Sequence, residues 1–195
     1  MIRLLLVASA PTAATRRAAF PTDEAIDERG AADAAALRGT MRTPDIALTG
    51  PALRARQTAT AIGLANATTD AALADLDYGS WTGATPAEID QRDPQGLARW
   101  MADPEAAPHG GESIAALFER TRALMARLTS ESGWVTAVTH AAVMRAAVVA
   151  ALDAPLAAFW RIDIAPLTRV TLHADGARWR LRAIENSTAP KPDRA

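Results

Sequence analysis

Short apolar runs alternate with segments of helical periodicity along this chain, and this alternation constrains the fold more than any other feature. Residues 4–7 form an uninterrupted apolar run, as in a central strand that is buried on both faces. Residues 45–49 and 134–139 are two further strand candidates, and each precedes a helical segment, 51–62 and 141–152. Strands that alternate with helices predict an α/β fold, a three-layer α/β/α sandwich around a mostly parallel sheet.

The remaining segments add to this plan. We expect an alanine-rich helix over residues 27–37 and a long amphipathic helix over residues 111–128. A short third strand is expected at residues 71–73. The alternating runs 169–173 and 179–184 flank a turn that contains glycine, so they predict a hairpin at the edge of the sheet.

The length of 195 residues fits one domain with a substantial core. We expect this domain to occupy residues 1–186 and the proline- and charge-rich residues 187–195 to be a disordered tail. The apolar start, residues 1–8, is too short for a signal peptide, and no run approaches the ~20 apolar residues that cross a bilayer. The sequence therefore predicts a soluble protein without membrane contact.

Charge and cysteine content exclude several classes of function. The chain has 21 Lys and Arg against 22 Asp and Glu, a formal net charge of -1, so we expect no nucleic acid partner. It has no cysteine, which excludes disulfides, thiolate nucleophiles and cysteine-ligated metals. This composition fits a reducing cytoplasm, and we expect neither a metal nor a cofactor.

Parallel sheets bind ligands at the carboxyl ends of their strands. In this chain, segments that follow predicted strands carry Arg54, Asp75 and His140. A guanidinium can bind two phosphate oxygens, free amides at a helix start add donors, and a carboxyl group can protonate a leaving oxygen. The combination suits a phosphate group.

Five segments carry motifs in a fixed order along the chain. Residues 6–12 read Leu-Val-Ala-Ser-Ala-Pro-Thr and are similar to a signature of the form Leu-Val-Arg-His-Gly-x-Thr. Residues 53–59 contain an Arg-Ala-x-x-Thr helix start, and residues 73–83 are similar to Leu-x-Glu-x-x-x-Gly-x-x-x-Gly. Residues 110–113 and 138–145 complete the set.

With these motifs, about residues 1–184 resemble the histidine phosphatase superfamily, whose fold is phosphoglycerate mutase-like. The chain lacks the long insertion of the glycolytic mutases, so it resembles the shorter phosphatase branch. In this family the first histidine attacks phosphorus and carries the phosphoryl group. Two arginines and a second histidine stabilise the phosphoryl oxygens.

Some residues of this chain match the functional positions of the family, and others do not. Arg54 and His140 match positions that clamp the phosphate, and Asp75 matches the proton donor as a shorter acid. By contrast, an arginine, the nucleophilic histidine and a glycine of the signature are replaced by Ala8, Ser9 and Ala10. The resemblance therefore implies a phosphate pocket that lacks its nucleophile.

Several further residues are assigned with alternatives. Thr12 is retained from the signature, and Ala141 opens a helix whose amides can bind phosphate. Arg16 is either a surface loop charge or a replacement for the missing arginine. His109 is a weaker candidate for the proton donor, and Asp75 alternatively caps a turn.

Two hypotheses for function follow. The preferred one is a histidine-phosphatase-like protein, catalytically impaired, that binds phosphate, a small phosphorylated molecule or a protein partner. The alternative is an active phosphomonoester hydrolase in which His140 activates Ser9 and Asp75 donates a proton. Whether the chain is an enzyme therefore stays open, and a homodimer is compatible with either hypothesis.

Overall fold

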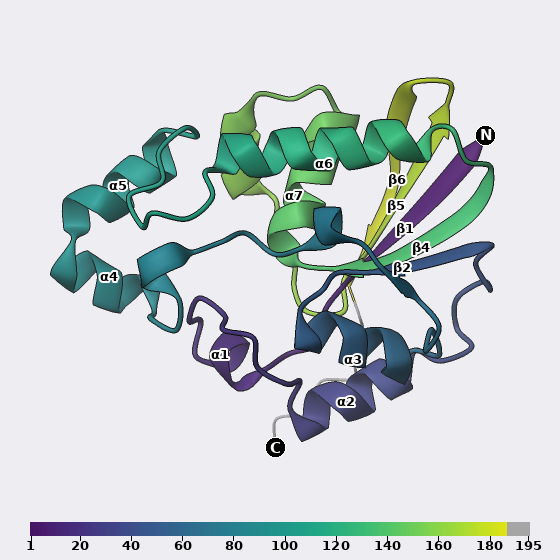
Figure 1. Ribbon diagram of the computed structural model, residues 1–195, viewed down its shortest axis with the longest axis horizontal. Helices are drawn as coiled ribbons and strands as arrows, with labels where there is room; N and C mark the ends of the chain where they lie inside the picture. The colour runs from purple at the N-terminus through teal and green to yellow at the C-terminus, as the bar shows by residue number, and fades with distance from the viewer. Residues whose placement is uncertain (187–195) are drawn as a thin grey trace, which may run out of the picture.

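A six-stranded sheet runs between two layers of helices in the computed structural model, which describes residues 1–186 (Figure 1). The strand order is β3-β2-β4-β1-β5-β6. Four strands pair in parallel, namely β1 (Ile2–Ala8), β2 (Ile46–Thr49), β3 (Thr68–Thr69) and β4 (Gly133–Thr139). The antiparallel strands β5 (Arg169–Asp175) and β6 (Arg178–Glu185) form the predicted edge hairpin. The predicted α/β sandwich with a mostly parallel sheet is confirmed. The proposed tail, residues 187–195, lies outside the described residues.

Helices cover both faces of the sheet. One face packs against α2 (Glu28–Ala35) and α3 (Leu53–Ala61), and the other against α6 (Ile114–Leu128) and α7 (Ala141–Ala151) (Figure 1). Three further helices lie beyond the carboxyl ends of the parallel strands: α1 (Ala13–Arg16), α4 (Pro86–Arg92) and α5 (Pro94–Ala102). Short 3-10 helices complete the fold: η1 (Ala71–Leu73), η2 (Gly79–Trp81) and η3 (Leu156–Arg161).

The core explains why β1 has no polar alternation. Ile2, Leu4 and Leu6 belong to the hydrophobic cluster that contains α6 and α7. Leu5 and Val7 point to the opposite face and pack with α2 and α3. Because both faces of the strand are buried, every position favours an apolar side chain.

The prediction of a strand at residues 71–73 is wrong. These residues form η1, and the third parallel strand is the two-residue β3 just before it. The carboxylate of Asp70 accepts a hydrogen bond from the Ala72 N–H at 2.9 Å and so caps a helical turn. Side-chain capping therefore outweighs the short apolar run. The helix predicted from residue 51 also begins later, at Leu53, because residues 51 and 52 form the bend that leads into it.

Within residues 1–186, no helix combines the length and the apolar character that a transmembrane span requires.

Candidate active site

Three neighbouring strands end side by side, and the residue that follows each lies at the same edge of the sheet. The Ser9 N–H donates to the Thr139 carbonyl at 2.8 Å, just after β1. The Gly50 N–H donates to the Val138 carbonyl at 2.9 Å, just after β2. His140 is the residue between β4 and α7. The chain thus brings Ser9, Gly50 and His140 together at the carboxyl ends of the strands.

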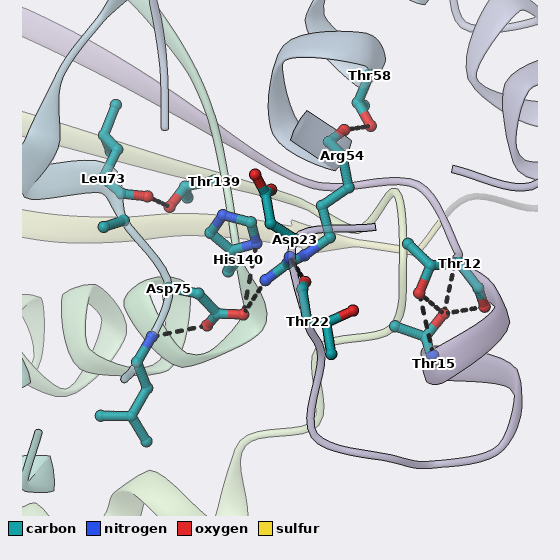
Figure 2. Close-up of polar contacts among 12 residues, drawn as sticks. Thr12, Thr15, Thr22, Asp23, Arg54, Thr58, Leu73, Asp75, Thr139 and His140 are labelled. Carbon is teal, nitrogen blue, oxygen red and sulfur yellow. Dashed lines mark hydrogen bonds and ion pairs between the residues drawn. The ribbon is translucent and has the colours of Figure 1, made fainter. Parts of the chain in front are cut away.

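Arg54 is the buried cation of this edge. It is the second residue of α3, and only 4% of its surface is exposed. One guanidinium nitrogen, Nη2, donates to Asp75 Oδ2 at 2.7 Å, and the other, Nη1, donates to the Thr22 carbonyl at 2.7 Å (Figure 2). Arg56, two residues further along the helix, is exposed.

Asp75 links Arg54 to His140. Its Oδ2 accepts from Arg54 and lies 3.6 Å from His140 Nδ1 (Figure 2). Its Oδ1 accepts from the Leu76 N–H at 2.9 Å, so the carboxylate also holds a turn. The structure therefore joins Arg54, Asp75 and His140 in one cluster.

His140 is an uncharged imidazole at neutral pH. It is 3% exposed, and this burial lowers its pKa to about 4, although Asp75 favours the protonated form. Arg54 and Arg120 also lower this pKa. Within residues 1–186 its Nε2 has no hydrogen-bond partner. Gly50 packs closely here, since a Cβ at this position would lie 3.4 Å from Nε2 and 2.5 Å from the Leu73 carbonyl oxygen.

The end of β1 is small and apolar apart from Ser9. Ala8 and Ala10 on either side are 3% and 0% exposed. Among the described residues, no hydrogen bond joins the Ser9 hydroxyl to His140. Thr12 is buried, caps α1 and donates its hydroxyl to Glu24 Oε1 at 2.7 Å. In this arrangement the hydroxyl hydrogen of Thr12 is already engaged.

Arg16 lies in an ion pair with Asp27. Its Nη2 donates to Asp27 Oδ1 at 2.9 Å, and its Nε donates to the other carboxylate oxygen. Asp27 is the N-cap residue of α2, so the guanidinium is drawn toward that helix. Of the two alternatives for Arg16, this geometry favours a loop charge. Ala141 is the first residue of α7, as expected.

His109 is not brought to the cluster. It is 2% exposed, its Nδ1 accepts from the Gly111 N–H at 3.0 Å, and its ring lies 5.0 Å from the Trp81 ring. Burial lowers its pKa. His109 belongs to an aromatic core formed with Phe20, Tyr78, Trp81 and Trp100.

The loop of residues 22–24 covers the cluster, and sequence reasoning missed it. The Thr22 carbonyl accepts from Arg54, and Asp23 Oδ1 accepts from the Leu53 N–H at 2.6 Å. Burial alone would raise the pKa of Glu24, but hydrogen bonds from Thr22 and Thr12 outweigh it and lower that pKa. Glu24 is therefore an anion. No periodic pattern in the sequence predicts that these acidic residues lie close to Arg54.

Arg120 supports the segment that carries Asp75. Its Nη1 donates to the carbonyls of Ala72 and Ala74 at 2.9 and 3.1 Å. Glu112 binds the same guanidinium through both oxygens, at 2.9 and 2.7 Å. The sequence places Arg120 within an amphipathic helix and does not reveal this contact.

No group of three or more His, Asp or Glu side chains within residues 1–186 is arranged to hold a metal ion. A hollow with a volume of about 1200 Å³ lies away from the cluster, between α6, the end of α7 and the β5-β6 hairpin. It is lined by none of Ser9, Arg54, Asp75 and His140. We place the candidate site by its chemistry and strand ends rather than by this hollow.

Comparison with known proteins shows the family to which this chain belongs. Residues 8–187 match the family profile of the histidine phosphatase superfamily (branch 1). Over 109 residues the chain is 35% identical to the bifunctional protein Rv2228c of Mycobacterium tuberculosis. This match covers 54% of this chain and 30% of that protein. Over 131 residues the chain is 34% identical to glucosyl-3-phosphoglycerate phosphatase of the same species. This match covers 57% of this chain and 59% of the relative.

A solved structure of mycobacterial glucosyl-3-phosphoglycerate phosphatase, in complex with VO3, superposes with a TM-score of 0.82. The two chains are 27% identical, and the match covers 92% of this chain and 96% of that one. The curated relatives above are matched over 30% and 59% of their own length.

Proposed function

Because the chain belongs to branch 1 of the histidine phosphatase superfamily, we propose that it binds a small phosphorylated molecule at the Arg54–His140 edge and turns it over poorly or not at all. Arg54 and His140 clamp the phosphate, Asp75 occupies the position of the proton donor, and the α7 start at Ala141 offers amides. Thr12 lies at the rim. Ser9 stands where the family carries its nucleophilic histidine.

The position of Ser9 carries this proposal. Its backbone follows β1 and is hydrogen-bonded to Thr139, the neighbour of His140. The family carries its nucleophilic histidine at this point, and a serine side chain is much shorter than an imidazole side chain. A serine hydroxyl attacks phosphorus only when a base removes its proton. No hydrogen bond among residues 1–186 joins the Ser9 hydroxyl to His140.

The flanking residues weaken catalysis further. Ala8 stands where the family carries an arginine, so one positive charge for the transferring phosphoryl group is absent. Loss of a single group that stabilises transition-state charge costs a factor of roughly 10² to 10³ in rate. The relative named glucosyl-3-phosphoglycerate phosphatase supports a small phosphorylated metabolite as the ligand. We further propose one domain over residues 1–186 and a cytoplasmic location, in keeping with the absence of cysteine.

One observation favours the alternative of an active hydrolase. His140 is neutral at pH 7, so it could accept the proton of Ser9. In that mechanism the Ser9 oxygen attacks phosphorus, its proton passes to His140, and the bond between phosphorus and the leaving oxygen breaks. The leaving oxygen takes a proton from the protonated carboxyl group of Asp75. The reaction would leave a phosphoserine that water hydrolyses.

The test of the proposal combines binding with turnover. Isothermal titration with inorganic phosphate should detect binding to the wild-type chain, and Arg54→Met should abolish it. Arg56→Met is the matched control, because Arg56 is exposed on the same helix. Equal phosphate binding by the wild type and the Arg54 variant would refute the pocket. Hydrolysis of generic phosphomonoesters by the wild type, lost in Ser9→Ala, would establish the alternative instead.

A further inference from the structure

The amino-terminal end of α3 already holds an anion from the chain itself. Helix α3 has nine residues, and its N-cap residue, Ala52, provides no side-chain cap. Instead the Leu53 N–H donates to Asp23 Oδ1 at 2.6 Å, across a sequence separation of 30 residues. The amide end of a helix is also the place where phosphate oxygens bind in many proteins.

Two guanidinium donors of Arg54 are occupied in the same way. Arg54 directs one guanidinium nitrogen at the Thr22 carbonyl and the other at Asp75. Figure 2 shows Asp23 beside Arg54 and His140, with Thr22 at the preceding position of the same loop. Every donor named for the phosphate clamp on α3 therefore faces an oxygen atom supplied by this chain.

The charges around Arg54 sum to a negative value. Asp75 is paired with Arg54, which leaves Asp23 and Glu24 as additional carboxylates at the same loop. Asp23 is close enough to influence the imidazole of His140 electrostatically. A phosphate dianion that approaches Arg54 therefore meets like charge at short range, which opposes binding.

Capping alone does not account for this arrangement. Asp93 makes the equivalent contact at α5, where its Oδ1 accepts from the Gly96 N–H at 2.9 Å. That contact lies on its own helix, three residues away. Asp23 instead comes from a separate loop and lies beside a buried arginine and a buried histidine whose Nε2 has no partner within residues 1–186.

We propose that Asp23 is an internal competitor for phosphate and sets the charge selectivity of the pocket: its carboxylate occupies the anion position at the start of α3, and a phosphorylated ligand binds by displacing it. This inference rests on the proposed phosphate pocket. It identifies a specificity-determining residue in a loop for which the motifs predict no role.

The test measures inorganic phosphate binding to the full chain by isothermal titration at one pH and salt concentration. Asp23→Asn and Asp23→Ala should each bind phosphate about tenfold more tightly than the wild type, because a like charge at the site is removed. Two variants are needed, since the asparagine amide could itself donate to phosphate. Asp93→Asn removes the same charge from a capping contact elsewhere and should leave the affinity unchanged.

Each outcome separates this inference from the pocket itself. Unchanged affinity in both Asp23 variants, with binding still lost in Arg54→Met, would overturn the competitor role and leave the pocket standing. An increase in Asp93→Asn equal to that in Asp23→Asn would also overturn it, because net charge alone would then be the cause. If neither the wild type nor the Asp23 variants bind phosphate, the pocket falls and the inference with it. Thermal unfolding of each variant verifies that the chain is folded.

Discussion

The end of β1 and the start of α3 meet at the same edge of the sheet but carry opposite kinds of residue. At the start of α3, Arg54 is buried and bound to Asp75, which in turn neighbours His140. At the end of β1, Ser9 stands between two buried alanines. In the family these two regions act together, one holding the phosphate and the other attacking it. Under the proposed function, the residues that hold phosphate are retained in this chain, whereas the region that would attack it consists of small side chains.

This difference suggests that binding and turnover can be separated in one scaffold. Arg54, Asp75 and His140 also contribute to the fold, because each is largely buried and paired with another. Ser9 contributes a backbone hydrogen bond to Thr139, which any residue except proline could make. Replacement of Ser9 therefore costs little stability, whereas replacement in the cluster costs much.

The largest expected effect is a gain of activity. The triple variant Ala8→Arg, Ser9→His and Ala10→Gly should hydrolyse phosphomonoesters roughly a hundredfold faster than the wild type, because it regains a nucleophile and a stabilising charge. Ala8→Arg with Ser9→Ala and Ala10→Gly is the control without a nucleophile. A folded triple variant no faster than this control would count against the assignment of the pocket.

Arg54→Met should lower the free energy of unfolding by about 4 kcal/mol, since it leaves Asp75 without its partner in a largely buried position. Arg56→Met on the exposed face should change it by less than about 0.5 kcal/mol. Urea unfolding of both variants measures the difference. If both variants lose a similar free energy of unfolding, the buried pair of Arg54 and Asp75 does not stabilise the fold more than an exposed arginine does.

Stability should decrease as pH falls from about 6.5 to about 4. The folded state keeps His140 neutral down to a pKa of about 4, whereas in the unfolded chain it takes up a proton near pH 6.5. The unfolded state therefore binds more protons in this window, and folding loses up to about 3 kcal/mol. His140→Gln should show a smaller loss over the same range. If the free energy of unfolding falls with pH in the same way in the variant and the wild type, the burial of neutral His140 is not the cause.

Arg120→Met should cost about 2 kcal/mol, because the carbonyls of Ala72 and Ala74 and the carboxylate of Glu112 lose a charged donor. The matched control is Arg122→Met, which removes an exposed pair with Glu119 and should cost only a few tenths of a kcal/mol. Chemical unfolding of both chains tests this. If the two costs are equal, Arg120 does not support the Asp75 segment.

The sequence predicted the sheet well where burial dictated the pattern. The apolar run of β1 and the alternation of β5 and β6 follow directly from which faces are covered. It failed at residues 71–73, because one capping aspartate converts a short apolar run into a helical turn. Intrinsic secondary-structure propensity does not decide the conformation of a segment as short as three residues.

The candidate site was predictable to the extent that it follows strands. Arg54 and His140 could be grouped because each comes after a correctly predicted strand. Asp75 was grouped with them through the strand predicted at residues 71–73, which is a 3-10 helix, and the structure nevertheless brings the three residues together. The pairing of Arg16 with Asp27 and the cover of residues 22–24 could not be predicted. Loop conformation depends on individual hydrogen bonds between segments, such as the one from Leu53 to Asp23, which no local pattern encodes.

Phosphate release from p-nitrophenyl phosphate by the wild type and by Ser9→Ala tests most directly whether this chain has kept the pocket and lost the nucleophile. We predict that the wild type releases phosphate no faster than Ser9→Ala, while inorganic phosphate still binds the wild type through Arg54. A wild-type rate that clearly exceeds the rate of Ser9→Ala would contradict the account, because the serine would then be a working nucleophile.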